Sequence, residues 1–273
     1  VVKQCFRKSS KFIKMAQKFV LNHQYPITQI EVESILKNFD SIDDYIAKGT
    51  RNSIKKTTLE SGKIATIKSF KIPNIINKFV YRFFRKSKAE RSFAYAKKLI
   101  ELGFNTPYPI AYIENKTSVS FLDSYYLCEL VSADLTYREL VEIPTWENRE
   151  EILKQFTQFT YNLHEAGIEF LDHSPGNTLI KKIGENQYEF YLVDLNRMIF
   201  HESMDFEQRM KNFSRLTPYQ DMVEIMAKEY AQLYARSEQE CHEKMWSLTE
   251  EFQAKFHQKQ ARKKKLKALI GKK

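Results

Sequence analysis

The sequence has little of what marks several protein classes. Its 273 residues include three cysteines, seven glycines and seven prolines. Cys5, Cys128 and Cys241 are too few and too scattered for a disulfide framework or a zinc site. No apolar run approaches the roughly 18 residues of a membrane-spanning helix. With 42% hydrophobic and 29% charged residues, the composition is that of a globular protein.

Targeting signals are also missing from the sequence. Neither a signal peptide nor a prenylation ending is recognisable, so we expect the protein in the reducing cytoplasm. The chain begins with Val1 rather than Met, so a lost leader stays an open alternative. Its length suggests one large domain or two lobes, and it contains no internal repeat.

The charge is positive overall and unevenly distributed. The net charge of +10 arises from 44 basic and 34 acidic residues. Bases gather in residues 1–20, 51–98 and 262–273, whereas residues 99–261 are acidic. This distribution predicts one face that meets an anionic partner, which could be a phosphate, a nucleic acid or a membrane.

Two basic segments sharpen this question. Residues 78–88 interleave aromatics with cations, which suits a nucleic-acid contact, an anionic membrane surface or a solvated helix. The tail at 262–273 has seven cations and no acid, like a peripheral tether to anionic lipid, although a purely solubilising tail is the alternative.

Local patterns predict an α+β protein whose first part is rich in strands and whose second part is helical. We expect a 1–44 extension, a nucleotide-binding lobe at 45–131, a helical lobe at 132–261 and the 262–273 tail. The expected elements are a hairpin at 51–72, a helix at 88–102 that ends at Gly103, strands at 110–113 and 125–131, a helix capped by Thr145 that ends at Gly167, a hairpin at 178–193, and helices after 217.

The most informative stretch runs from Asp172 to Asp194. Asp172 begins an irregular loop, Asn177 follows it, and a hairpin then leads to Asp194. The outer ends of a hairpin lie about 5 Å apart, so Asn177 and Asp194 should be neighbours. Phosphoryl transfer needs such a set, with one carboxylate to orient a hydroxyl and an amide and a second carboxylate to hold Mg²⁺.

Here the sequence resembles the protein-kinase-like fold and, within it, the bacterial lipopolysaccharide kinase family, which phosphorylates the inner-core sugars Kdo or heptose. The similarity rests on the Asp172–Asn177 loop, on Val193-Asp194-Leu195, on Gly49-Thr-Arg51-Asn52 and on Leu102-Gly-Phe-Asn-Thr-Pro107. It covers residues 45–215 approximately and implies a two-lobed α+β fold with ATP and Mg²⁺ as cofactors.

The resemblance also implies roles for individual residues. Asp172 becomes the catalytic base, and Asn177 and Asp194 become the metal ligands. Lys68 is similar to the strand lysine that holds the α- and β-phosphates, with Lys63 and Lys71 as alternatives. Glu129 and Val131 resemble the hinge that binds adenine, and Arg51 and Asn52 would cover the phosphates.

Three features depart from the protein-kinase pattern. Phe170 replaces a histidine, Asn196 replaces a glycine, and Gly49 is the only glycine before residue 61. Within the predicted helix at 88–102, Glu90 is the nearest acid for an ion pair with Lys68, yet its position three residues after Ser87 indicates a capping box.

We therefore predict an ATP-dependent kinase for a hydroxyl of a lipopolysaccharide core sugar, at the cytoplasmic face of the inner membrane. A kinase for a protein or another small molecule is the nearest rival. A nucleotide-binding pseudokinase scaffold is a second, favoured by the sparse glycines. The loop motif argues against a nucleic-acid-binding protein. His164 and His173 are interpreted as structural rather than catalytic.

Overall fold

The computed structural model describes residues 15–48, 52–71, 81, 85–117 and 120–270. These residues form two units, each with a hydrophobic core of its own. The first contains residues up to 94 together with 108–130, and the second contains residues 95–107 together with those from 131 onward. The chain thus passes between the units three times: within helix α3 (Lys88–Glu101), between Pro107 and Tyr108, and after Leu130.

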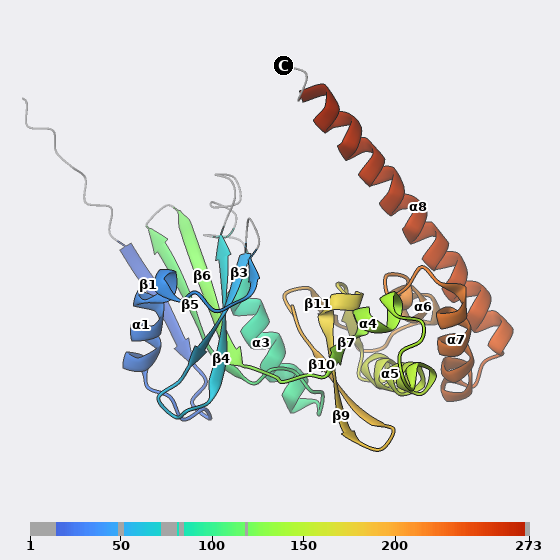
Figure 1. Cartoon of the computed structure of the whole chain (residues 1–273), viewed down its shortest axis with the longest axis horizontal. Coiled ribbons are helices and arrows are strands. Elements are labelled where there is room, and N and C mark those ends of the chain that lie inside the picture. The colour runs from blue at the N-terminus through green and yellow to red at the C-terminus, as the bar shows by residue number, and fades with distance from the viewer. Residues whose placement is uncertain (1–14, 49–51, 72–80, 82–84, 118–119, 271–273) are drawn as a thin grey trace, which may run out of the picture. The chain divides into compact units, whose positions relative to one another are not determined.

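The first unit is built on a six-stranded antiparallel sheet (Figure 1). The strand order is β1-β5-β6-β4-β3-β2, so strands far apart in the sequence become neighbours. The strands are β1 (Met15–Leu21), β2 (Tyr45–Lys48), β3 (Asn52–Thr58), β4 (Ile64–Lys71), β5 (Pro109–Thr117) and β6 (Phe121–Glu129).

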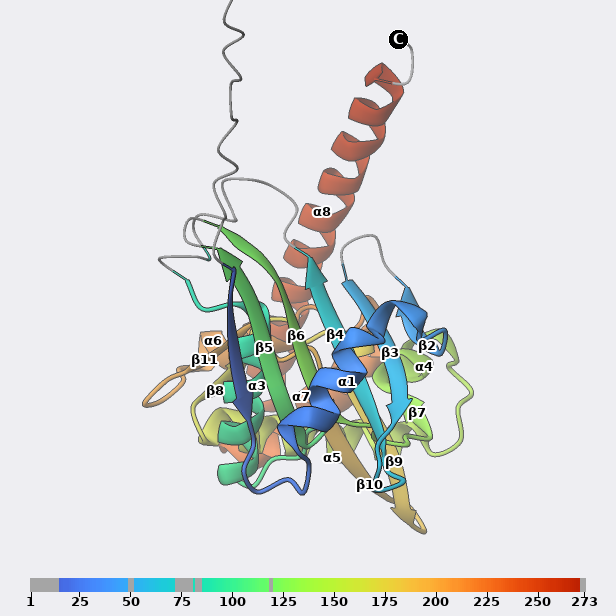
Figure 2. The same cartoon turned by 90° about the vertical axis from the view of Figure 1, so that its left-hand side faces the viewer.

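Helix α1 (Gln29–Lys37) covers one face of this sheet (Figure 2). Val32 of α1 belongs to the same buried cluster as Ala65 and Ile67 of β4. Successive strand residues point to opposite faces, so Lys68 of β4 lies on the face away from α1.

The described part of the expected 1–44 extension contributes β1 and α1 to the first unit. β1 pairs with β5 over seven residue pairs, from Met15 opposite Thr117 to Leu21 opposite Ala111. Thr28 caps α1 by accepting a hydrogen bond from the Glu31 amide (3.1 Å). This segment is part of the sheet and its core, because Tyr25, Val32 and Phe39 are buried in the same hydrophobic cluster as the strands.

The second unit is mainly helical and carries two small sheets. β10–β9–β7 form one sheet and β11–β8 the other. Its helices are α4 (Tyr137–Glu142), α5 (Arg149–Glu165), α6 (Phe206–Phe213), α7 (Gln220–Tyr234) and α8 (Glu238–Ile270). Its strands are β7 (Leu135–Thr136), β8 (Ile168–Phe170), β9 (Thr178–Gly184), β10 (Gln187–Leu192) and β11 (Met198–Phe200).

Helix α8 is longer than the helices it packs against (Figure 1). Cys241 and Met245 in its first turns join the core, whereas every residue from Ala254 to Ala268 is exposed. The basic segment expected as a separate tail is therefore, up to Ile270, the continuation of this helix. Within the described ranges, no helix combines the length and the apolar character that crossing a bilayer requires.

Most predicted elements are confirmed, with one wrong helix start. The two predicted hairpins are present as β3–β4 and β9–β10, and α3 and α5 lie close to their expected limits. Thr145, however, does not cap α5. The chain turns once more after Ile143, whose carbonyl accepts from the Trp146 amide, and the helix starts after Asn148.

Candidate active site

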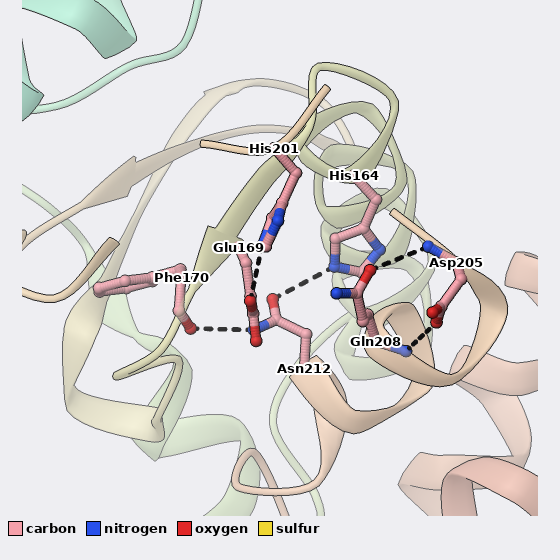
Figure 3. Close-up of polar contacts among 7 residues, drawn as sticks. All are labelled: His164, Glu169, Phe170, His201, Asp205, Gln208 and Asn212. Atoms are coloured by element: carbon pink, nitrogen blue, oxygen red, sulfur yellow. Dashed lines mark hydrogen bonds and ion pairs between the residues drawn. The ribbon is translucent and has the colours of Figure 1, made fainter. Parts of the chain in front are cut away.

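The loop that carries Asp172 is fixed by a close backbone contact at the end of α5. Gly167 has φ +69°, and a Cβ added there would lie 2.1 Å from the carbonyl oxygen of His201. The His201 amide in turn donates to the Gly167 carbonyl (2.8 Å). The Glu169 carboxylate contacts the His201 ring at 2.8 Å (Figure 3). Only glycine fits this position, which brings β8 and β11 together just before the loop.

Asp172 lies two residues after the end of β8, and its carboxylate is largely covered. Its side chain is 20% exposed, and Oδ1 pairs with Nη2 of Arg215 at 2.9 Å. Among the described residues, no hydrogen bond to its Oδ2 is found. Arg215 was not anticipated from the sequence, because it lies 44 residues after Leu171, whose carbonyl it also contacts, with no motif around it.

Asn177 and Asp194 meet at the outer end of the β9–β10 hairpin, as predicted. The side-chain Nδ2 of Asn177 donates to the Asp172 carbonyl (2.7 Å), which ties the two ends of the loop together. The Val193 amide donates to the Asn177 carbonyl (3.0 Å). The loop and the hairpin thus bring Asp172, Asn177 and Asp194 to one place in the second unit.

Asp194 has a left-handed backbone with φ 59°. Aspartate and asparagine adopt this conformation more readily than most residues, and such strain gathers at functional sites. Its Oδ1 accepts a hydrogen bond from Nδ2 of the buried Asn196 (2.6 Å). Asn196 therefore orients the Asp194 carboxylate.

Residues 102–107 hold the same β9–β10 hairpin through hydrogen bonds to the backbone of β10. Thr106 donates its hydroxyl hydrogen to the Leu192 carbonyl (2.8 Å), and the Leu192 amide donates to the Asn105 carbonyl (3.1 Å). Residues 102–107, singled out in the sequence, thus hold the strand that ends just before Asp194.

The two histidines are buried, as expected of structural residues. Burial lowers the pKa of His164 to about 3 and that of His173 to about 4, so both are neutral at neutral pH. His164 is hydrogen-bonded to Tyr230 and Asn212, whereas the ring nitrogens of His173 have no partner among the described residues.

The predicted nucleotide residues of the first unit lie on β3, β4 and the end of β6. Lys68 is opposite Tyr126, with Nζ 5.4 Å from the centre of the Phe70 ring. Asn52 is opposite Phe70, and its buried Oδ1 has no hydrogen-bond partner within the described ranges. Arg51 and the side chain of Lys71 lie outside the described residues.

Lys63, the alternative to Lys68, forms an ion pair with the Glu129 carboxylate at 2.7 Å. The Glu129 and Leu130 amides donate to the Tyr108 and Ile64 carbonyls (both 2.9 Å). These backbone hydrogen bonds therefore fix the end of β6, where the predicted hinge begins. Val131 follows it, at the start of the second unit.

The capping prediction for α3 is confirmed for Ser87. The Ser87 hydroxyl accepts from the Glu90 amide at 3.0 Å. The Glu90 carboxylate pairs with Lys18 of β1 at 3.3 Å. Its ion pair therefore joins the start of α3 to the edge strand of the sheet.

A comparison with protein-family models decides the family. Residues 71–237 match the model described as the lipopolysaccharide kinase (Kdo/WaaP) family. The chain belongs to this family. It is therefore a kinase, with ATP as the phosphoryl donor. The comparison with curated proteins found no match.

One of the similar solved structures shows the fold, at low sequence identity. The structure titled "WaaP in complex with acyl carrier protein" is similar with a TM-score of 0.59 and 13% identity, covering 88% of this chain and 98% of the other. A Rio2 kinase complex with ADP, Mg²⁺ and phosphoaspartate, from Chaetomium thermophilum, gives a TM-score of 0.45 and 17% identity, covering 82% of this chain and 69% of the other. The predicted protein-kinase-like α+β fold is confirmed.

Proposed function

We propose that this kinase transfers the γ-phosphoryl group of ATP to a hydroxyl of a lipopolysaccharide inner-core sugar, either Kdo or heptose. The observation that carries the proposal is the meeting of Asp172, Asn177 and Asp194 at one loop and one hairpin end. Family membership supports the substrate class.

Asp172 serves as the base that orients the attacking hydroxyl. Arg215 holds its Oδ1, so Oδ2 accepts the hydrogen of the sugar hydroxyl. It takes up the proton as the new O–P bond forms and the bond from the γ-phosphorus to the β–γ bridging oxygen breaks, which releases ADP. Holding the hydroxyl in line with the γ-phosphorus converts a bimolecular encounter into a positioned step, which is the main work of a phosphotransferase site.

Asn177 and Asp194 fit the needs of a bound Mg²⁺. Because Nδ2 of Asn177 donates to the Asp172 carbonyl, its amide oxygen is left for a ligand. Mg²⁺ prefers oxygen ligands and needs only one or two protein carboxylates when phosphates complete its shell. When bound, this ion would neutralise charge on the phosphates.

The nucleotide roles fall to residues of the sheet and of the segment that follows it. Lys68 binds the α- and β-phosphates, and Asn52 covers them together with Arg51. Glu129 and Val131 offer backbone groups to adenine. The buried, unpartnered Oδ1 of Asn52 supports a ligand-binding role for the start of β3.

The acceptor places the enzyme at an acidic membrane surface, on the cytoplasmic face of the inner membrane. The exposed end of α8 supports this location, because it carries seven basic and no acidic residues from Lys255 to Lys267. Cations near anionic lipid contribute about 1 kcal/mol each.

Labelled ATP offered with Kdo, heptose and longer core acceptors tests the function. The parent is expected to label one acceptor in a Mg²⁺-dependent way. Asp172→Ala should lose about 10²–10⁴-fold in kcat while binding ATP normally.

Asp194→Asn should lose Mg²⁺-dependent ATP binding in calorimetry with its fold intact, because an amide is a weaker ligand for a hard cation.

Asp43→Asn is the matched control, because it removes the same charge at an exposed position of the first unit. This variant should behave like the parent. Phosphorylation of a protein or an unrelated small molecule, with no labelled sugar, would move the function to the rival kinase class. ATP binding without turnover on any acceptor would favour a scaffold.

A further inference from the structure

One short segment holds the three consecutive residues that lead into the loop. Nδ2 of Asn212, near the end of α6, donates to the Phe170 carbonyl (2.9 Å, Figure 3). Arg215 then donates from Nη1 to the Leu171 carbonyl (2.7 Å) and pairs through Nη2 with Asp172 (2.9 Å). Two backbone oxygens and the carboxylate itself are thus fixed by two side chains.

The Asn212 amide is itself fixed in one orientation. Its Oδ1 lies 3.2 Å from Nε2 of His164, and Nδ1 of His164 lies 2.9 Å from the Tyr230 hydroxyl. An amide oxygen only accepts, so His164 donates from Nε2 and its Nδ1 accepts from Tyr230. Because burial keeps this imidazole neutral, one tautomer satisfies both contacts.

Helix α6, which carries Asn212, is held at its start by a capping box and along its length by Arg209. Asp205 and Gln208 form a capping box at the start of α6, with contacts of 2.8 and 3.0 Å (Figure 3). Arg209 donates to the Tyr230 hydroxyl (3.4 Å) and pairs with Glu165 of α5. The chain of hydrogen bonds therefore links helices α5, α6 and α7 to the backbone before Asp172.

Arg215 also lies against an aromatic ring of helix α8. Its guanidinium carbon lies 5.5 Å from the centre of the Phe252 ring of α8. A guanidinium pre-oriented in this way presents two donors in a fixed fork, which a lysine cannot reproduce.

We propose that Asn212 and Arg215 are positioning residues that hold the Asp172 loop in its reactive geometry. This inference rests on the proposed function of Asp172. The two residues fix the backbone at 170–171 and one carboxylate oxygen, so the other oxygen faces the acceptor. A misplacement of about 1 Å at a reacting group costs about 10²-fold in rate.

Arg215→Ala and Arg215→Lys test the role, with Arg236→Ala as the matched control. Arg236 also stacks on an aromatic ring, that of Phe206 at 4.4 Å, without touching the loop. We expect Arg215→Ala to lower kcat about 10²-fold with KM for ATP within threefold. Arg215→Lys should be intermediate, and millimolar guanidinium should restore part of the Arg215→Ala rate. A purely structural loss would not be rescued in this way.

Hydrogen–deuterium exchange gives a readout that needs no acceptor. In Arg215→Ala and Asn212→Ala, amides of the peptide 168–177 should exchange at least tenfold faster, and those of the hairpin at 178–192 should stay unchanged. Exchange and turnover like the parent's in both Arg215 variants would overturn the inference. Faster loop exchange in a protein whose parent labels no sugar would reject the proposed substrate and leave the positioning role standing. Uniformly faster exchange across the second unit would reject positioning in favour of general stability.

Discussion

At the scale of single residues, His173 shows how burial near the site affects stability. Its ring lies 5.3 Å from that of Phe156 and 5.7 Å from that of Phe170, measured between centres. Burial lowers its pKa from 6.5 to about 4. The unfolded chain therefore binds a proton between these values that the folded chain does not. The stability from the neutral ring is complete above pH 6.5 and is lost as the pH falls toward 4.

We predict that His173→Leu weakens this dependence. The drop in the free energy of unfolding between pH 7.5 and 5.5 should be smaller than the parent's by about 1.4 kcal/mol, the value of one pKa unit. Urea unfolding at both pH values measures it. His23→Gln, at an exposed position, is the matched control and should retain the parent's dependence. An unchanged dependence in His173→Leu would contradict the assignment.

The placement of the candidate site residues could be predicted only where they are connected by a short stretch of sequence. Asp172, Asn177 and Asp194 were found because one loop and one hairpin connect them. Arg215 and Asn212 gave no signal, since each reaches the loop from a residue more than 40 positions away. Polar contacts of this kind depend on tertiary packing, which no local pattern encodes.

At the scale of elements, a comparison of two glycines distinguishes the cost of a strained backbone from the cost of too little space for a side chain. Gly103 and Gly167 both have positive φ, +84° and +69°. Gly103 has nothing within 4 Å of an added Cβ, whereas Gly167 faces the His201 carbonyl. The sequence marked both only as places where a helix ends.

We predict unequal costs for alanine at these positions. Gly103→Ala should lower the free energy of unfolding by about 1–2 kcal/mol, the cost of a left-handed backbone. Gly167→Ala should cost more and should also lower kcat, because the β8–β11 contact must open just before Asp172. Chemical denaturation and the sugar-kinase assay measure both effects. Equal losses, or a fully active Gly167→Ala, would show that the close contact is not needed.

Local signals were sufficient for long or sharply bounded elements and insufficient for short ones. The hairpins and α3 carry alternation, caps and glycine stops in their own sequences. β8 and β11 have three residues each, and β1 is completed by a partner almost 100 residues away. Such strands are stabilised by pairing with distant segments, so propensity alone could not reveal them.

At the scale of the whole molecule, the sequence is basic at both ends and acidic over residues 99–261, and the exposed end of α8 carries part of the positive charge. The end of α8 is helical and exposed, and its cations extend around it with Leu266 among them. A basic helix of this kind gains from an anionic bilayer through charge first and through a small apolar contact second. The same charge would also attract RNA, so the two partners need a direct comparison.

We predict that residues 262–273 bind the protein to acidic vesicles. Co-sedimentation with anionic vesicles should be strong at low salt and weak at physiological salt, since the Debye length falls from ~30 Å at 0.01 M to ~8 Å at 0.15 M. Removing these residues, or replacing their seven cations by glutamine, should weaken that binding. Turnover of a short water-soluble sugar should survive, because the proposed base and metal ligands belong to the loop and the hairpin. Unchanged sedimentation in both variants would reject the tether, and preferential binding to RNA over vesicles of equal charge would assign the basic helix to nucleic acid.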